Sequence, residues 1–357
     1  MKRYIHIVTL FLLSMTGCSK SNSSGGTEEF GGYIFFSQGM DTKAALIESA
    51  DAMEQFGVVG FKYDESLTWE THKASNPTPN VFYNDAGTAI ENVETLTCND
   101  DGTASYIPLQ GWSNINRYAF FAYYPIGNGN INLVNLDGTA YTGGVPAVKY
   151  SMNTTGLKES MVDVMTAPAH TDKYWHSATD NNVVNNDIRL SFRHRLSCLG
   201  LQISNSSEGS IMINSAELLI SGISHKKVII PLDGTAVIKS AESSPLSADL
   251  ALTLSDEETI LLPSGNPVEI SDKLIFIPQT EDISVKVRIS YIRSAMVGYS
   301  GYEDTVTLPE AQPLTTALAE GRKHLVRLNF TDSNVTVTAV VDSQGWVDMP
   351  EVEDSFN

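Results

Sequence analysis

The sequence predicts an all-β protein. Short runs rich in aromatic and β-branched residues recur along the chain between turn-forming residues, as at 118–124 and 325–330. Residues 285–289 alternate strictly between apolar and charged side chains, which indicates a strand with one buried face. The tetrapeptide Asp-Gly-Thr-Ala begins at Asp101, Asp137 and Asp233. Asp-Gly supplies the positive φ of a tight turn, so each copy is expected to connect two strands.

Further runs of the same kind are expected to form the remaining strands. They are residues 33–36, 56–63, 188–192, 199–203, 211–213, 227–230, 274–277 and 335–340. Signals for helices are few. Residues 43–55 are expected to be partly helical, and residues 156–167 are expected to form one helix with Leu157, Met161 and Val164 on one side, ending before Pro168.

The amino-terminal segment has the layout of a bacterial lipoprotein signal. Lys2 and Arg3 precede a short apolar run, residues 5–15, which is too short to span a bilayer comfortably as a helix. Cys18 follows the small residue Gly17 directly. We expect cleavage before Cys18 and lipidation of its thiol, with a chance cysteine near an ordinary cleavage site as the alternative.

The composition predicts how the mature chain is organised. After the signal comes a polar Ser/Gly stretch, which cannot bury apolar surface and is expected to be flexible. A turn-rich break at residues 181–187 predicts a boundary between two halves of about seven strands each. The expected division is a signal peptide at 1–17, a linker at 18–29, β-sandwich domains at 30–185 and 186–350, and an acidic tail at 351–357.

Charge and cysteine usage exclude several classes of function. The chain holds 42 Asp and Glu against 23 Lys and Arg, and loss of Lys2 and Arg3 with the signal lowers the net charge from −19 to −21. Such a surface repels nucleic acid. Cys98 and Cys198 can form a disulfide in an oxidising compartment, but their expected location in different domains favours two buried thiols. Their spacing is not that of a metal site, and we expect no metal and no cofactor.

No group of residues has the pattern of a catalytic site. His194 and Cys198 would lie about 13 Å apart on one strand, so core roles are favoured over a nucleophilic pair. The sequence lacks a Gly-x-Ser-x-Gly motif, a phosphate loop and a dinucleotide fingerprint. We therefore expect a binding or structural protein and not an enzyme. The tryptophans, which are more often core anchors, are the candidates for a glycan-binding surface: Trp69, Trp112, Trp175 and Trp346.

Seven segments, in order along the chain, resemble the fimbrillin-like proteins of Bacteroidetes, which include the type V pilins. They are Ile34-Phe35-Phe36 with Asp41-Thr42-Lys43-Ala44, Phe120-Phe121-Ala122-Tyr123-Tyr124-Pro125, Asp163-Val164-Met165-Thr166-Ala167, Leu190-Ser191-Phe192-Arg193-His194-Arg195-Leu196-Ser197, Phe276-Ile277-Pro278-Gln279, Gly321-Arg322-Lys323-His324-Leu325-Val326-Arg327-Leu328, and residues 340–346 ending at Trp346. The resemblance covers nearly the whole mature chain.

The resemblance implies a fold and a way of assembling. Members of this family have two tandem transthyretin-like Greek-key β-sandwich domains and are exported to the outer membrane as lipoproteins. In the polymerising members, a protease cuts after a basic residue and removes the first strand. A strand from the next subunit then fills the groove, because an unpaired sheet edge is a template for strand addition.

This sequence departs from that pattern at the processing site. After Arg3 the first arginine is Arg117, and Lys43 occupies the position of the family's arginine. Cleavage there needs a protease that accepts lysine. Without a cut the chain stays attached through Cys18, which slightly favours a lasting anchor, while polymerisation after a cut at Lys43 remains open. Residues 335–347 are the best donor strand, although the short tail leaves in doubt how much strand it can offer.

We therefore expect a structural or accessory subunit of cell-surface fimbriae that supports adhesion. Its expected partners are other fimbrial subunits through strand addition, the outer membrane through lipid on Cys18, and a ligand on a host or bacterial surface. Asp304-Thr305-Val306 resembles the site at which Bacteroidetes add O-glycans to exported proteins, which makes Thr305 a candidate acceptor. The alternative function is that of a surface glycan-binding lipoprotein.

Overall fold

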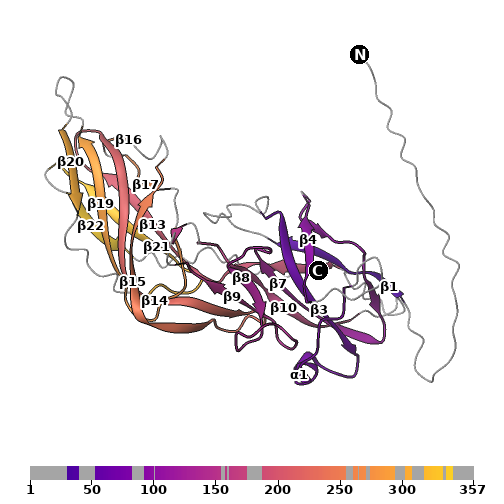
Figure 1. The fold of residues 1–357 in the computed structure, drawn as a ribbon. Helices are drawn as coiled ribbons and strands as arrows, with labels where there is room; N and C mark the ends of the chain where they lie inside the picture. The colour runs from indigo at the N-terminus through magenta and orange to yellow at the C-terminus, as the bar shows by residue number, and fades with distance from the viewer. Residues whose placement is uncertain are drawn as a thin grey trace, which may run out of the picture.

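The computed structural model shows a protein built almost entirely of β-strands (Figure 1). Its one helix among the described residues is α1 (Trp69–Lys73), and no described helix is long and apolar enough to cross a membrane. The all-β expectation is confirmed. The structure describes residues 30–39, 53–82, 92–99, 101–153, 157–158, 161–174, 187–254, 260–263, 265–270, 274–293, 302–307, 317–332 and 335–340.

An eight-stranded sheet dominates the amino-terminal part of the molecule, and a two-stranded sheet lies beside it. In spatial order the large sheet consists of β11 (Asp187–Ser191), β2 (Phe35–Gly39), β5 (Thr103–Ser105), β4 (Glu94–Cys98), β3 (Gln55–Asp64), β7 (Asn116–Tyr124), β10 (Met165–Tyr174) and β12 (Arg193–His194). The small sheet pairs β1 (Phe30–Tyr33) with β6 (Gly111–Ser113).

The eight-stranded sheet is buried on both faces at its centre. Along β3, the side chains of Val59 and Phe61 join the larger hydrophobic core, whereas those of Phe56 and Val58 join a smaller, separate one. Successive side chains of a strand point to opposite faces, so a continuous apolar run fits a strand covered on both sides. A glycine is required at position 60, on the face that carries the smaller core, because a Cβ there would lie 2.8 Å from the Phe82 ring.

Two further sheets form the rest of the molecule. The five-stranded one contains β17 (Val268–Glu269), β13 (Ser197–Asn205), β21 (Lys323–Phe330), β22 (Val335–Val340) and β18 (Leu274–Phe276). The seven-stranded one contains β20 (Tyr302–Thr307), β19 (Ser284–Arg293), β14 (Ile211–Pro231), β9 (Ala147–Ser151), β8 (Ile131–Val134), β15 (Ile238–Leu252) and β16 (Ile260–Leu261).

One long strand joins the two ends of the molecule. β14 has 21 residues; its beginning pairs with β19, and its last residues pair with β9 (Figure 1). The sheets therefore cross the boundary expected at position 186, because β9, which also pairs with β8, pairs with β14 beyond it, while β11 and β12 complete the sheet that precedes it. The division into tandem transthyretin-like domains stays a prediction.

The three Asp-Gly-Thr-Ala segments form the expected turns. In each, one carboxylate oxygen accepts hydrogen bonds from the backbone N–H and the hydroxyl of the threonine two residues on, at 2.6–3.0 Å. Gly102, Gly138 and Gly234 have φ of 81°, 81° and 83°, a conformation that glycine adopts without strain. The hydroxyl bonds, and then the N–H bonds, hold the pKa of Asp101 and of Asp137 below its usual value.

The expected helix at residues 156–167 is wrong. Met165 and Ala167 belong to β10, and the described residues before them form no regular helix. Leu157, Met161 and Val164, which suggested a helical face, do pack in or against the larger core, but without a regular helix, and the following Met165 enters the smaller core. Pro168 falls at a register shift of β10 and does not stop a helix. Of the expected helix at 43–55, only residues 53–55 are described, and Gln55 begins β3.

Candidate functional site: the amino-terminal strand and its groove

β2 is paired along both of its edges. It runs parallel to β11, with Phe36 opposite Ile188, and antiparallel to β5, with Phe36 opposite Ala104. Within the described ranges, β11 pairs with no strand other than β2. Removal of β2 would therefore leave two rows of unpaired backbone groups facing one groove, which is an arrangement that promotes strand addition.

Side chains of this segment alternate between core and solvent. Ile34 and Phe36 are 0% and 1% exposed, whereas Tyr33 and Phe35 are 44% and 46% exposed. This is the period of two that an extended chain imposes. The two inward side chains belong to the smaller core, together with Ile188 from the neighbouring strand β11. The segment thus closes a sheet and fills part of a hydrophobic core.

An aromatic pocket surrounds Phe36. Its ring lies 5.2 Å from the ring of Phe120 and 5.8 Å from that of Tyr106, both edge to face, and 6.3 Å from that of Phe82. Aromatic pairs in such geometries each contribute about 0.5–1.5 kcal/mol beyond the area that they bury. The pocket is therefore shaped for a phenyl ring and not for a generic apolar side chain.

Tyr106 also fixes the backbone at Ile34. Its hydroxyl donates to the Ile34 carbonyl at 2.9 Å and accepts from the Gln110 N–H at 3.2 Å. The Ile34 N–H in turn donates to the Gln110 carbonyl at 2.8 Å. Burial raises the pKa of Tyr106 to about 12, so the phenol keeps its proton and stays a donor at neutral pH. Both polar groups of the Ile34 backbone are thereby satisfied.

The start of the segment is held by a second strand. β1 pairs antiparallel with β6, with Phe30 opposite Ser113 and Tyr33 opposite Gly111. Residues 30–39, which we call the amino-terminal segment, therefore contact the body of the protein from end to end. We call the surface that they cover between β5 and β11 the groove.

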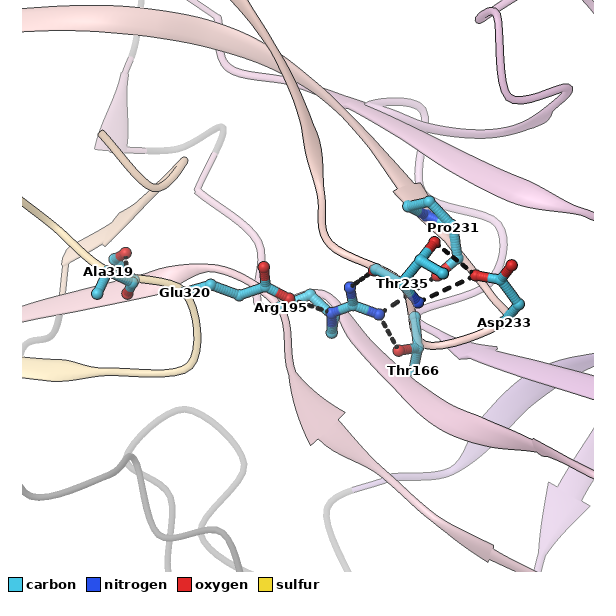
Figure 2. A network of polar contacts seen from close by, with 8 residues as sticks. Thr166, Arg195, Pro231, Asp233, Thr235, Ala319 and Glu320 are labelled. Carbon is cyan, nitrogen blue, oxygen red and sulfur yellow. Dashed lines mark hydrogen bonds and ion pairs between the residues drawn. The ribbon is translucent and has the colours of Figure 1, made fainter. Parts of the chain in front are cut away.

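A buried arginine, Arg195, connects several strands next to β12, which is the edge of the eight-stranded sheet opposite to β11 (Figure 2). The Arg195 guanidinium donates to Glu320 Oε1 at 2.5 Å, to Thr166 Oγ1 at 2.9 Å, and to the carbonyls of Pro231 and Thr235 at 3.3 and 2.7 Å. These partners come from β10, the end and following turn of β14, and the segment before β21. Since all of them are parts of the framework, the arrangement is structural: it holds the sheets together.

The structure places His194 beside a carboxylate. His194 Nδ1 lies 2.9 Å from Asp163 Oδ1, and both side chains are buried. Cys198 lies on β13, the next strand along the chain but part of the five-stranded sheet, and is fully buried in the larger core. Among the described residues, no group of three or more His, Cys, Asp or Glu side chains is arranged to hold a metal ion. These contacts favour a structural role for His194.

Several residues singled out from the sequence lie outside the described residues. They are Cys18, Lys43, Trp175 and Trp346. Thr305 is described at the level of the backbone: it lies on β20, opposite Ser290 of β19. Lipidation, processing and glycosylation at Cys18, Lys43 and Thr305 therefore stay predictions.

The described cysteines and tryptophans belong to the framework. Cys98, half-buried on β4, and the fully buried Cys198 on β13 are not joined by a disulfide. Trp69 and Trp112 are 3% and 2% exposed, and each packs against other aromatic rings, as in the Trp112–Tyr118 pair at 4.9 Å. Neither tryptophan presents a ring face to solvent, so neither supports a glycan-binding surface.

Sequence reasoning did not assign the residues that build the groove. Residues 33–36 are all apolar, so the pattern could not distinguish the inward Ile34 and Phe36 from the outward Tyr33 and Phe35. No local signal connects this run to Tyr106 or to β11. For Arg195, the available signal was an arginine directly before buried Leu196, a position at which a charged side chain needs partners.

Comparisons with known proteins agree with this architecture. A fimbrial protein from Bacteroides vulgatus has a similar structure, with a TM-score of 0.59, 18% sequence identity, and coverage of 88% of this chain and 99% of that chain. A candidate cell adhesion protein from Bacteroides ovatus matches with a TM-score of 0.49 at 13% identity, covering 89% of this chain and 99% of that one. Curated proteins gave no significant match. The first of these similarities shows a shared fold.

A family model provides the assignment. The fimbrillin-like model matches residues 42–343, which is most of the chain. The match begins just beyond the amino-terminal segment and includes the strands that line the groove. The chain therefore belongs to the fimbrillin-like family.

Proposed function

We propose that the protein is a structural or accessory subunit of cell-surface fimbriae that acts in adhesion and has no catalytic role. It reaches the outer membrane as a surface-exposed lipoprotein through Cys18. The amino-terminal segment is a removable strand, and a strand of another subunit takes its place in the groove. The observation that carries the proposal is that this segment is paired on both edges while it inserts Ile34 and Phe36 into a core.

A cut after Lys43 would separate the segment from the rest of the chain soon after Gly39. The contacts that hold it would then become intermolecular, so its loss would depend on concentration and on competition. An empty groove exposes unpaired N–H and carbonyl groups together with an apolar pocket, which an incoming strand satisfies at once. The uncut, lipid-bearing chain is the tethered form, and the cut chain is the form that accepts a partner.

A reversible lock on the segment tests this proposal. Ser37 on β2 and Thr103 on β5 are direct antiparallel partners, so cysteines at both positions would be within disulfide reach. We expect the oxidised Ser37→Cys, Thr103→Cys chain, cut after Lys43 and mixed with other fimbrial subunits, to stay out of polymers on non-reducing gels. Reduction should restore its entry into laddered polymers, and the Ser37→Cys single variant should enter them under both conditions.

If the oxidised, cut double variant enters polymers as readily as its reduced form, assembly does not use this groove. In cells, deletion of the protein should reduce the number or the length of fimbriae, or their attachment. Unchanged fimbriae and unchanged adhesion would contradict the assignment as a fimbrial subunit.

A further inference from the structure

We propose that the groove selects, from another subunit, a strand with an aliphatic side chain followed two residues later by a phenyl ring, and that residues 335–347 of a second copy of this chain are not that strand. The inference rests on the proposed strand exchange and adds the side-chain pattern of the incoming strand. It is carried by the two inward positions of the amino-terminal segment and by the residues that line them.

The two inward positions have different requirements. At the first position the aliphatic side chain of Ile34 is fully buried in the smaller core, and the Tyr106 hydroxyl binds the backbone there. The Phe36 site is bounded by the rings of Phe82, Tyr106 and Phe120 at centroid distances of 5.2–6.3 Å. An incoming strand that is held by the same backbone bonds must present its side chains at the same spacing.

The carboxy-terminal residues of this chain do not offer that pattern. In residues 335–347, the alternating set that begins at Val335 continues with Val337 and Ala339 and contains no aromatic residue. Trp346 is preceded two residues earlier by Gln344 and followed two residues later by an aspartate. No Phe, Tyr or Trp in residues 335–357 has an aliphatic residue two positions away in either direction.

A misfit of this kind has a physical consequence. A valine at the Phe36 site would leave a void against three rings, and the surrounding framework of paired strands can close over it only in part. A glutamine at the Ile34 site would bury an amide whose partners the groove does not supply, because the Tyr106 hydroxyl is already bound to backbone. The carboxy-terminal segment therefore fits poorly in both possible registers.

The carboxy-terminal strand also has a place of its own. β22 pairs with β21 along its whole length, from Leu325 opposite Val340 to Phe330 opposite Val335. Donating it to a neighbour would break this ladder and uncover a strand that includes buried Leu328. Groove chemistry and strand pairing thus agree that residues 335–347 of a second copy are not the partner strand.

Peptide exchange on the cut chain tests the inference. The full-length protein, with a site for a specific protease in place of residues 40–43, is cut while folded and mixed with fluorescent peptides. The peptides are residues 30–39, the same peptide with Phe36→Val, the same peptide with Phe35→Val, and residues 335–347. The Phe35→Val peptide is the matched control, because Phe35 points outward.

We expect the peptide of residues 30–39 and its Phe35→Val form to bind within about threefold of each other. The Phe36→Val peptide and residues 335–347 should bind at least about tenfold more weakly, which corresponds to about 1.4 kcal/mol. Equal binding of residues 335–347 and residues 30–39 would overturn the inference while leaving strand exchange intact. Failure of residues 30–39 to bind would overturn the proposed exchange itself, and the inference with it.

Discussion

Phe36→Ala in the uncut chain is the most informative single substitution. The ring is 1% exposed and touches three other aromatic rings, so its removal deletes the transfer free energy of a buried phenyl group and leaves a cavity. Phenylalanine-to-alanine changes at such sites cost about 3–5 kcal/mol. The upper part of that range is expected here, because paired strands on both sides limit how far the pocket can collapse.

Hydrogen exchange and urea denaturation together measure this effect. We expect a lower denaturation midpoint and faster amide exchange in β2, β5 and β11, with little change in β19 and β21. Phe35→Ala is the matched control on the same strand, and it should cost less than about 1 kcal/mol because that side chain is 46% exposed. Equal effects of the two substitutions would refute the assignment of Phe36 as the residue that seats the segment.

Three other substitutions test the framework and its response to pH. Arg195→Met should destabilise the chain by about 1–3 kcal/mol in urea denaturation, because it removes the donor to Thr166 and to the carbonyls of Pro231 and Thr235. A loss below about 1 kcal/mol would contradict its role in holding the sheets together. Burial, and then Arg322, lowers the pKa of His324 to about 4, so the folded state resists its protonation. The free energy of unfolding therefore keeps its full value above about pH 6.5 and falls by at most about 3 kcal/mol as pH drops toward 4. The substitution His324→Gln should flatten this dependence of stability on pH in that window. Gly234→Ala should cost about 1 kcal/mol for its φ of 83° alone, whereas Gly129→Ala, also in open space, should change thermal stability little.

The local sequence pattern was sufficient to predict a strand or a turn where that element depends mainly on its own residues. The alternation at residues 285–289 and the aromatic run at 118–124 lie in β19 and β7, and the Asp-Gly-Thr-Ala segments form turns. Each of these features depends on the period of side chains in an extended chain or on the conformational freedom of glycine. Both properties are present in a few consecutive residues.

The remaining features depend on partners that are distant in the sequence. Residues 211–213 and 227–230 were expected as separate strands, yet both lie in β14, which continues between them because β15 pairs with that stretch. At residues 156–167, apolar spacing suggested one helical face, whereas the end of this stretch belongs to β10, in which Met165 and Ala167 face the smaller core. The groove requires β2 and β11 to meet in parallel, a pairing that neither strand specifies alone.

The amino-terminus of the chain in assembled fimbriae tests the central claim most directly. Mass spectrometry should be applied separately to the fimbrial and membrane fractions. Strand exchange in the groove predicts that assembled chains begin at Ala44, whereas the uncut chain in the membrane carries a lipid on Cys18. Assembled chains that retain residues 30–39 covalently joined to the body of the protein would contradict the account.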